Sequence, residues 1–306
     1  MKLYGGIEAG GTRFTCAVAT TPDPMVEPRV SQLETYEVPT TTPEETLGKV
    51  ADFFREHDLE ALGIASFGPI ELRRGLPKYG YITTTPKPGW KDVDLVQYFQ
   101  RTFGVPTGFD TDVNASALAE VSYGAAQGRS DAIYITVGTG IGGGAMINGE
   151  MLHGLLHPEM GHLPVPRHPR DDYPGYCTFH RDCLEGMASG VAISDRWKTR
   201  PETLPPDHEA WELEAYYLAR GISAMIYTLS PQIIVCGGGV MRQEQLFPLI
   251  RRQVVQMLHG YVQSEEITSR IDGFIVKPGL GARSGIVGAL ELAMRAKNAG
   301  ERKIKS

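Results

Sequence analysis

The sequence lacks the features that mark secreted and membrane-bound proteins. It has no run of about eighteen apolar residues, and its first residues, MKLYGGIEAGGT, lack the apolar segment of a signal peptide. Only 4 cysteines occur in 306 residues, too few for a disulfide framework. We therefore expect a cytoplasmic protein with reduced thiols and no membrane partner.

Positive charge is also scarce. The 30 Lys and Arg residues are outnumbered by 36 Asp and Glu residues, which gives a formal net charge of -6. Such a chain has no long-range attraction for nucleic acid or for an anionic membrane. An anionic ligand must then be held by local dipoles, single basic side chains or a metal ion, so we expect pockets and no nucleic-acid partner.

The chain is rich enough in apolar residues to bury a large interior. Hydrophobic residues make up 42% of it, and its length favours two domains over one. Strand-like and helix-like segments follow each other along the sequence, which is the pattern of an α/β protein.

A compact C-x2-H-x2-C run holds two of the cysteines, Cys177 and Cys183, with His180 between them. With His162 as a fourth ligand the set is Cys2His2, which is typical of structural zinc. The alternative is that the histidines lie in surface loops and the thiols are free. A catalytic zinc is disfavoured, because the segment from His157 to His162 is one residue longer than H-E-x-x-H and has proline at its second position.

Two glycine-rich hairpins are predicted. Residues 3–20 read as a strand, a tip containing Gly10, Gly11 and Thr12, and a returning strand. Adjacent glycines let a ligand approach the backbone, and the N–H groups with the Thr12 hydroxyl could bind a phosphate. Taken alone, this tip is better explained as a simple tight turn.

The second hairpin runs from Ser130 to Glu150. Its tip, which contains Gly138, Thr139 and Gly140, satisfies G-x-G-x-x-G, but a strand and the turn signal Asn-Gly follow where a dinucleotide fingerprint needs a helix. Two similar hairpins about 130 residues apart predict a duplicated βα core with two phosphate cradles. No G-x4-G-K-[ST] motif occurs, which excludes a P-loop enzyme.

Polar residues follow two predicted strands at the carboxyl ends, where ligands bind in open α/β sheets. One strand ends in the turn 66–70, which contains Gly68. The other leads through Asp110 and Asp112 to Asn114 at the start of a helix. Asp110 could be a helix cap, whereas Asp112 is the better candidate for a general base, since a base belongs at the edge of a rigid element.

Further elements are predicted around these motifs. We expect helices at 43–57, from near Asp92, and at 209–229, and a strand over the QLETYEVPT run at 32–40. We expect Trp90 to be a packed anchor, and a direct contact with the substrate is the alternative. A buried strand enters the turn formed by Gly237, Gly238, Gly239, Val240 and Met241. That turn is either a nucleotide-binding loop or a tight connection.

Taken together, the motifs resemble those of the ROK family of sugar kinases, in the actin-like ATPase superfamily, and most closely its zinc-containing bacterial fructokinases. The resemblance extends over nearly the whole chain. It rests on the zinc cluster and on residues 8–12, 111–114, 137–143, 159–162, 183–186 and 234–240.

The resemblance implies a two-domain actin-like ATPase (ribonuclease H-like) fold with a duplicated βα core and a central cleft. The small domain would comprise residues 1–115, with the C-terminal helix 285–306 returning to it. The large domain would comprise residues 116–284 and carry the zinc loop. A homodimer is expected, because dimers are common among the relatives.

The resemblance also implies a reaction, in which ATP phosphorylates the 6-hydroxyl of a hexose with Asp112 as base. Zn²⁺ would be structural and Mg²⁺ would accompany ATP. The two glycine tips and the 237–241 turn would bind the nucleotide. The sugar would be bound by Gly68, Asp112, Asn114, Glu159, His162 and Glu185, with His162 also a zinc ligand.

Three departures from the family pattern bear on the substrate. Glu8 stands where the superfamily usually has Asp, so a water-mediated magnesium contact would be made by a longer side chain or not at all. The family's glucokinases tend to carry C-x-C-G-x2-G-C, in place of C-x2-H-x2-C, and Asn before an L-P-G-W loop, where this chain has residues 85–90, TPKPGW. These last two departures favour D-fructose as the substrate.

Other functions stay open at this stage. Mannose, glucose or an N-acetylated amino sugar could replace fructose. ROK members that are sugar-responsive repressors carry a helix-turn-helix before the first strand, whereas here a strand is expected from Leu3. A zinc hydrolase would need an open coordination position on the metal.

Overall fold

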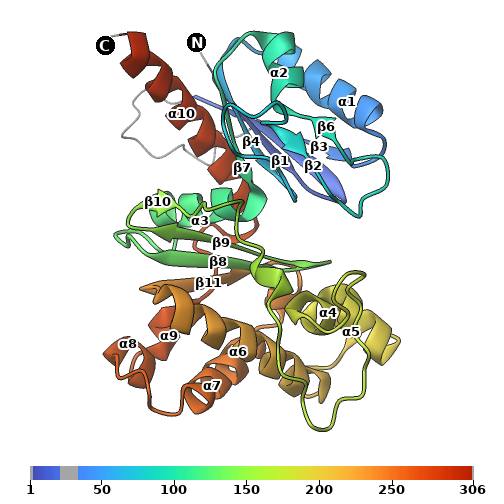
Figure 1. Ribbon diagram of the computed structural model, residues 1–306, viewed down its shortest axis with the longest axis vertical. Helices are drawn as coiled ribbons and strands as arrows, with labels where there is room; N and C mark the ends of the chain where they lie inside the picture. The colour runs from blue at the N-terminus through green and yellow to red at the C-terminus, as the bar shows by residue number, and fades with distance from the viewer. Residues whose placement is uncertain (1–2, 21–33, 305–306) are drawn as a thin grey trace. The chain divides into compact units, whose positions relative to one another are not determined.

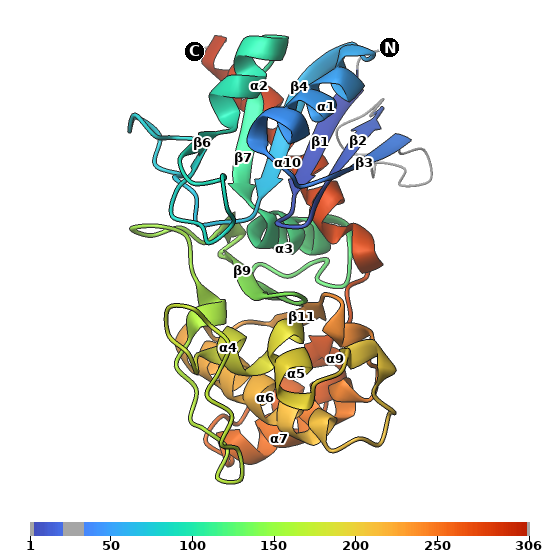
Figure 2. The same ribbon diagram turned by 90° about the vertical axis from the view of Figure 1, so that its right-hand side faces the viewer.

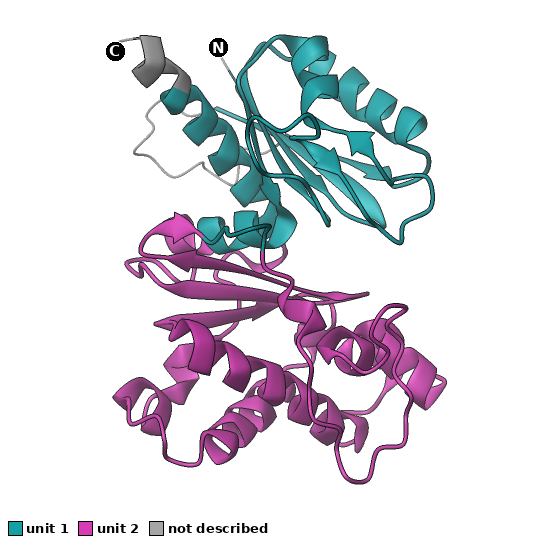
Figure 3. Cartoon of the chain, viewed as in Figure 1, with its two compact units in different colours: residues 1–119, 152–157, 283–306 teal, residues 120–151, 158–282 magenta. Residues whose placement is uncertain are grey.

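The computed structural model describes residues 3–20 and 34–304, and the chain divides into two compact units (Figure 3). Unit 1 comprises residues 1–119, 152–157 and 283–306, and unit 2 comprises residues 120–151 and 158–282. Residues 152–157, which the sequence-based division assigned to the large domain, thus belong to unit 1.

Parts of three predictions fall on residues that the structure does not describe. These are residues 1, 2 and 21–33 of the predicted small domain, the first two residues of the 32–40 strand, and the last two of the 285–306 helix. In the described ranges, no helix is both long enough and apolar enough to cross a membrane.

Unit 1 contains a mixed sheet in the order β3-β2-β1-β4-β7. Its strands are β1 (Leu3–Ala9), β2 (Arg13–Ala19), β3 (Glu34–Pro39), β4 (Leu59–Ser66) and β7 (Thr107–Thr111). β1 and β2 pair antiparallel around the glycine tip, which confirms the first predicted hairpin. β4 and β7 run parallel to β1, so their carboxyl ends meet at one edge of the sheet.

Helices cover both faces of this sheet. Figures 1 and 2 show α1 (Pro43–Arg55) and α2 (Val96–Phe103) over one face and α10 (Ser284–Ile304) over the other. The backbone of α10 lies directly on two strands, because a Cβ on Gly63 would lie 1.8 Å from Ala289 O and one on Gly108 2.3 Å from Leu292 O. Any larger residue at these two positions would push α10 off the sheet.

The start of α2 differs from the prediction. The helix begins at Val96 and not near Asp92, because residues 93 and 94 form a short strand, β6 (Val93–Asp94), paired with β5 (Tyr81–Ile82). Asp94 Oδ1 then accepts the Gln97 N–H at 2.9 Å, as a capping aspartate does. The predicted start of the helix was therefore too early, because the capping aspartate is Asp94 and not Asp92.

Trp90 is a packed anchor, as predicted. Its side chain is fully buried and its Nε1 donates to Thr41 O at 2.8 Å. Its ring lies 5.2 Å from that of Phe14 and 5.8 Å from that of Phe67, between centroids. The indole is thus part of the hydrophobic core of unit 1.

Unit 2 contains a second sheet, in the order β10-β9-β8-β11-β12. Its strands are β8 (Ala132–Val137), β9 (Ile141–Ile147), β10 (Glu150–Met151), β11 (Ile233–Gly237) and β12 (Ile275–Val276). β8 and β9 form the second predicted hairpin, and β11 runs parallel to β8 as β4 does to β1. Each unit thus has a glycine-tipped hairpin followed by a parallel strand, which confirms the predicted duplicated βα core.

The helices of unit 2 lie mainly on one face of its sheet, where α6 and α7 pack side by side (Figures 1 and 2). They are α4 (Leu184–Ala188), α5 (Gly190–Trp197), α6 (Ala210–Leu229), α7 (Leu246–Leu258), α8 (Glu265–Thr268) and α9 (Ile271–Phe274). One helix, α3 (Asp112–Tyr123), begins in unit 1 and ends in unit 2. Short 3-10 turns complete the chain at Met160–His162, Pro201–Thr203, Val240–Arg242 and Gly281–Arg283.

Candidate functional site

Asp112 is the first residue of α3, at the carboxyl end of β7. Its side chain is half-buried, and its Oδ1 accepts the Val113 N–H at 2.9 Å. Burial raises the pKa of Asp112 to about 6, a value at which the carboxylate is ionised at neutral pH yet more basic than an ordinary aspartate. These are the properties of a general base.

Glu8 is a second carboxylate of unit 1 with altered acidity. Burial, and after it the negative charge of Asp112, raises the pKa of Glu8 to about 7. The carboxylate also lies against Gly285, in the first turn of α10, where a Cβ would be 2.4 Å from Glu8 Cδ. The positive end of a helix dipole favours an anion at this place. A bound cation would displace the remaining proton.

The first glycine tip is held by β3 and the residue after it. Thr40 Oγ1 donates to Gly10 O at 2.7 Å, and Thr40 N donates to Thr12 O at 3.0 Å. Gly11 is exposed, and a Cβ built there meets nothing within 4 Å. The tip is therefore braced from one side, with the backbone at Gly11 open on the other.

The residues beside Asp112 form a hydrogen-bonded junction. Asp110 Oδ1 accepts from Thr111 N at 2.8 Å and from Asn114 Nδ2 at 2.9 Å. The helix cap is Thr111, whose Oγ1 accepts the Asn114 N–H at 3.1 Å. The capping role considered for Asp110 is therefore wrong, because its carboxylate orients the Asn114 amide.

Two histidines that the sequence interpretation left without a role lie in unit 1. His153 Nε2 lies 2.8 Å from Asp110 Oδ2, and Asp110 raises the pKa of His153. His157 is buried, and its Nε2 accepts the Ile70 N–H at 3.0 Å, next to the turn that contains Gly68. This bond also argues against His157 as half of a metal-binding H-E-x-x-H pair. The two histidines stand four residues apart in the sequence HGLLH, which is a visible signal.

Unit 2 contains a cavity of about 360 Å³ at the second glycine tip. Its wall includes Gly138, Thr139, Gly190, Ser194, Gly239 and Val240. The second tip, the start of α5 and the predicted nucleotide turn thus meet at one cavity. At the turn, Gly238 has φ +95°, and a Cβ there would lie 2.4 Å from Val137 O.

Other cavity-lining residues were not foreseen. Gly190 N donates to Gly138 O at 2.7 Å, which fastens the first residue of α5 to the second tip. Arg200, Glu202 and Gln243 add charged and polar groups to the lining. A helix start and a basic side chain both suit a phosphate-bearing ligand.

Glu185 is bound to the second glycine tip. Its Oε2 accepts the Ile141 N–H at 3.0 Å, and a Cβ on Gly140 would lie 2.5 Å from the same oxygen. The half-buried carboxylate therefore braces the tip of the β8–β9 hairpin from within unit 2. Its predicted contact with a sugar stays a prediction.

Glu159 precedes a 3-10 turn in unit 2, and His162 is the last residue of that turn. Glu159 is exposed, and its carbonyl accepts the His162 N–H at 3.0 Å. Between them, Gly161 lies on β9, since a Cβ there would be 1.8 Å from Ile141 O. The turn is thus fixed against the strand that leaves the second glycine tip.

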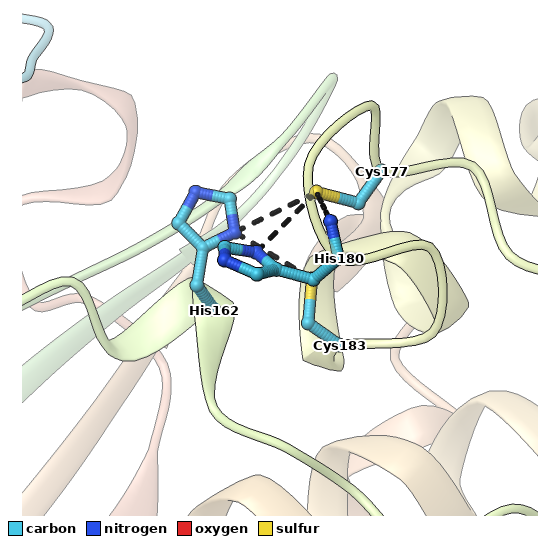
Figure 4. A group of neighbouring side chains, drawn as sticks. All are labelled: His162, Cys177, His180 and Cys183. Atoms are coloured by element: carbon cyan, nitrogen blue, oxygen red, sulfur yellow. Dashed lines mark hydrogen bonds between the residues drawn. The ribbon is translucent and has the colours of Figure 1, made fainter.

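The predicted zinc ligands come together in unit 2. Ligand atoms of His162, Cys177, His180 and Cys183 all lie within 4.8 Å of one another, and the four side chains point toward a common centre (Figure 4). His162 Nδ1 is 3.5 Å from Cys183 Sγ and 3.8 Å from Cys177 Sγ. His180 Nδ1 is also 3.8 Å from Cys177 Sγ.

These distances match a metal centre. A tetrahedral zinc ion with bonds of about 2.3 Å to sulfur and about 2.0 Å to nitrogen sets sulfur–nitrogen distances of about 3.5 Å. Burial raises the pKa of the Cys183 thiol, so that an incoming metal ion must displace its proton. Two cysteines and two histidines suit zinc and fill a closed tetrahedral shell, which leaves no position for a catalytic water.

Comparison with known proteins matches residues 4–296 to the ROK family. The fructokinase of Zymomonas mobilis is 45% identical over 307 residues, with coverage of 97% of this chain and 98% of that protein. A protein of Bacillus subtilis named as a putative fructokinase is 44% identical over 294 residues, with coverage of 96% of each chain.

Among solved structures, the ROK hexokinase of Thermus thermophilus superposes with a TM-score of 0.72 at 26% identity. The superposition covers 97% of this chain and 100% of the hexokinase. This likeness, together with the two sheets described above, confirms the predicted actin-like ATPase fold.

Proposed function

The chain belongs to the ROK family, and on this basis we propose that it transfers the γ-phosphoryl group of ATP to the 6-hydroxyl of D-fructose, giving fructose 6-phosphate and ADP. The observation that carries the proposal is Asp112, a half-buried carboxylate with a pKa of about 6 at the carboxyl end of a strand. The full-length similarity to fructokinases supports the choice of sugar.

Asp112 accepts the proton of the sugar hydroxyl as that oxygen attacks the γ-phosphorus. Phosphoryl transfer asks for little covalent chemistry from the protein, so positioning and charge stabilisation dominate the barrier. A base of this kind typically contributes a factor of about 10² to 10⁴. The start of α3 suits this role, since the helix holds the carboxylate still and its dipole favours the ionised form.

Backbone groups bind the nucleotide. Gly138 and Thr139, which line the cavity of unit 2, hold the β-phosphate region together with Gly140. The turn from Gly237 through Gly238, Gly239 and Val240 to Met241 binds the adenosine. In unit 1, Gly10, Gly11 and Thr12 bind the transferring phosphoryl group.

Polar groups bind the sugar. These groups are those of Gly68, Asp112, Asn114, Glu159, His162 and Glu185. His162 has two ring nitrogens for its two roles, because Nδ1 faces the cysteine sulfurs and Nε2 remains for a hydroxyl. A site of this kind rejects other sugars by leaving its hydrogen-bonding groups unpaired.

Two metal ions complete the proposal. The Cys2His2 cluster would hold Zn²⁺, which fixes the loop between Glu159 and Glu185. Mg²⁺ would enter with ATP and neutralise phosphate charge, and the Glu8 carboxylate is a candidate to bind it or its water. A homodimer is the expected assembly, and light scattering at the concentration of the assay tests it.

A coupled ADP-release assay tests the reaction. Fructose, mannose, glucose and N-acetylmannosamine are offered separately with ATP and Mg²⁺, and the product is identified by the position of its phosphate. We expect fructose to give the highest kcat/KM, with the 6-phosphate as product. Release of ADP that none of the sugars stimulates, or equal rates with Asp112→Asn, contradicts the proposal.

A further inference from the structure

Residues 152–157, LHGLLH, leave β10, pack with unit 1 and return to unit 2 at Pro158. We call this segment the histidine strap. His153 lies near the start of the strap, and His157 is its last residue. The middle of the strap is exposed, since Leu155 exposes 80% of its surface. Each histidine contacts unit 1 at one of the two strand ends that carry proposed sugar-binding groups.

His153 is linked to Asn114 through Asp110. Asp110 is 1% exposed, and its two carboxylate oxygens face two different side chains, whose nitrogens, His153 Nε2 and Asn114 Nδ2, are 3.4 Å apart. Oδ2 faces His153 Nε2 at 2.8 Å, and Oδ1 accepts from Asn114 Nδ2 at 2.9 Å. A carboxylate accepts and does not donate, so His153 carries its proton on Nε2 and the Asn114 amide turns its NH2 group toward Asp110. This fixes the direction of the Asn114 carbonyl oxygen.

His157 acts at the other strand end. Its Nε2 accepts the Ile70 N–H at 3.0 Å, so its proton resides on Nδ1. Its ring edge also lies under Gly68, since a Cβ there would be 3.2 Å from His157 Cε1. A buried imidazole thus supports the turn after β4 and satisfies a backbone donor that would otherwise lose its partner.

We propose that the histidine strap positions the sugar-binding groups of unit 1, with His157 holding the Gly68–Ile70 turn and His153 orienting Asn114 through Asp110. Both histidines are positioning residues, because each acts on the sugar through another residue. The inference rests on the proposed sugar-kinase function. It adds that the strap helps the site to select polyhydroxylated substrates. Because neither bond involves the nucleotide cavity, their loss acts on the sugar and not on ATP.

Two substitutions of His157 test the proposal. His157→Gln keeps an acceptor near the position of Nε2, whereas His157→Leu has a similar volume and no acceptor. We expect His157→Leu to raise the KM for the sugar about tenfold, the effect of one lost hydrogen bond, with the KM for ATP unchanged within about twofold. His157→Gln should restore most of the loss, and Leu155→Ala, on the same strap, should have no effect.

Amide hydrogen exchange at Ile70 gives a readout that does not depend on activity. Exchange should be faster in His157→Leu than in the parent enzyme and close to the parent rate in His157→Gln. The sugar in the kinetic test is whichever one the parent phosphorylates best, so a different preferred sugar does not remove the test. If the parent phosphorylates none, the proposed function fails, and Ile70 exchange still decides whether the strap holds the turn.

The exposed His153 provides an independent check that is less sensitive to folding. His153→Phe removes the ring nitrogen that faces Asp110, and His153→Gln keeps a donor. We expect the Phe variant to raise the sugar KM severalfold and the Gln variant to do so less. Unchanged sugar KM values in both His157→Leu and His153→Phe, or equal rises in the KM for sugar and for ATP, overturn the inference.

Discussion

The carboxylate of Glu8 lies so close to Gly285 that a Cβ on the glycine would be 2.4 Å from Glu8 Oε1. A side chain at the start of α10 and a glutamate on β1 therefore exclude each other. The absence of a β-carbon at Gly285 thus leaves the space that the Glu8 carboxylate occupies.

The first prediction follows from this contact. Gly285→Ala should lower the free energy of unfolding by about 1 to 3 kcal/mol, the usual cost of overpacking, and should raise the Mg²⁺ concentration needed for half-maximal activity. The double variant Glu8→Asp/Gly285→Ala should recover much of both losses, because the shorter side chain withdraws from the new methyl group. Gly48→Ala in α1, where a Cβ meets nothing within 4 Å, is the matched control. Urea unfolding and magnesium titrations measure the effects.

The second prediction concerns Asp112. Asp112→Asn should lower kcat about 10² to 10⁴-fold, because the amide cannot accept a proton, while the KM for ATP changes little. In the parent enzyme kcat/KM should fall as the pH drops through about 6, since only the ionised carboxylate is a base. The pH–rate profile from pH 5 to 8 checks this. An acid limb that persists unchanged in a weakly active Asp112→Glu variant would assign the limb to another group.

The third prediction links Glu8 to stability. Its pKa is raised from 4.5 to about 7 in the folded protein, so between these values the folded state binds more protons than the unfolded state. The contribution of Glu8 to stability is therefore fully present below pH 4.5 and is lost as the pH rises through about 7. Glu8→Gln should stabilise the magnesium-free protein by on the order of 2 kcal/mol at pH 8 and by little at pH 4. Thermal unfolding at both pH values tests it, and a gain confined to pH 4 would have the wrong sign.

The fourth prediction concerns the metal centre. Purified protein should contain one zinc ion per chain, and its removal by a chelator should lower the melting temperature and abolish most activity. Magnesium alone should restore neither, since the Cys2His2 cluster has no magnesium-like oxygen ligands. Elemental analysis of Cys183→Ser should show loss of the ion. Full recovery of chelated protein on magnesium alone would mean that the cluster has no structural role.

The fifth prediction compares two neighbouring glycines. Gly238→Ala should weaken ATP binding at least tenfold, because the residue has φ +95° and its Cβ would lie 2.4 Å from Val137 O. Gly239→Ala should cost much less in binding and in stability, since a Cβ at that position meets nothing within 4 Å. Calorimetric titration with a non-hydrolysable ATP analogue measures the difference. Equal losses in the two variants would indicate a steric effect of ligand contact instead of backbone strain.

The local features of the site were predictable from the sequence. The two glycine tips, the Asn148–Gly149 turn with φ of 53° and 77°, and the Asp112 position depend on residues next to each other in the chain. The zinc ligands were also recognisable, because three of the four lie within seven consecutive residues. Glycines that mark turns and residues that cap helices act over short distances, so their patterns are visible without coordinates.

The long-range contacts were not predictable. Asp110 and His153 are 43 positions apart, and Ile70 and His157 are 87 positions apart. No periodicity links such pairs, because they meet only after the sheet of unit 1 has formed. The bond between Glu185 and Ile141 N has the same origin, since it spans 44 positions.

The close packing of α10 against Gly63 and Gly108 has a consequence for the synthesis of the protein. During translation the strands of unit 1 leave the ribosome first. α10, which covers one face of their sheet, leaves it only after every residue of unit 2. Until then, the face of that sheet that includes Gly63 and Gly108 has no helix over it.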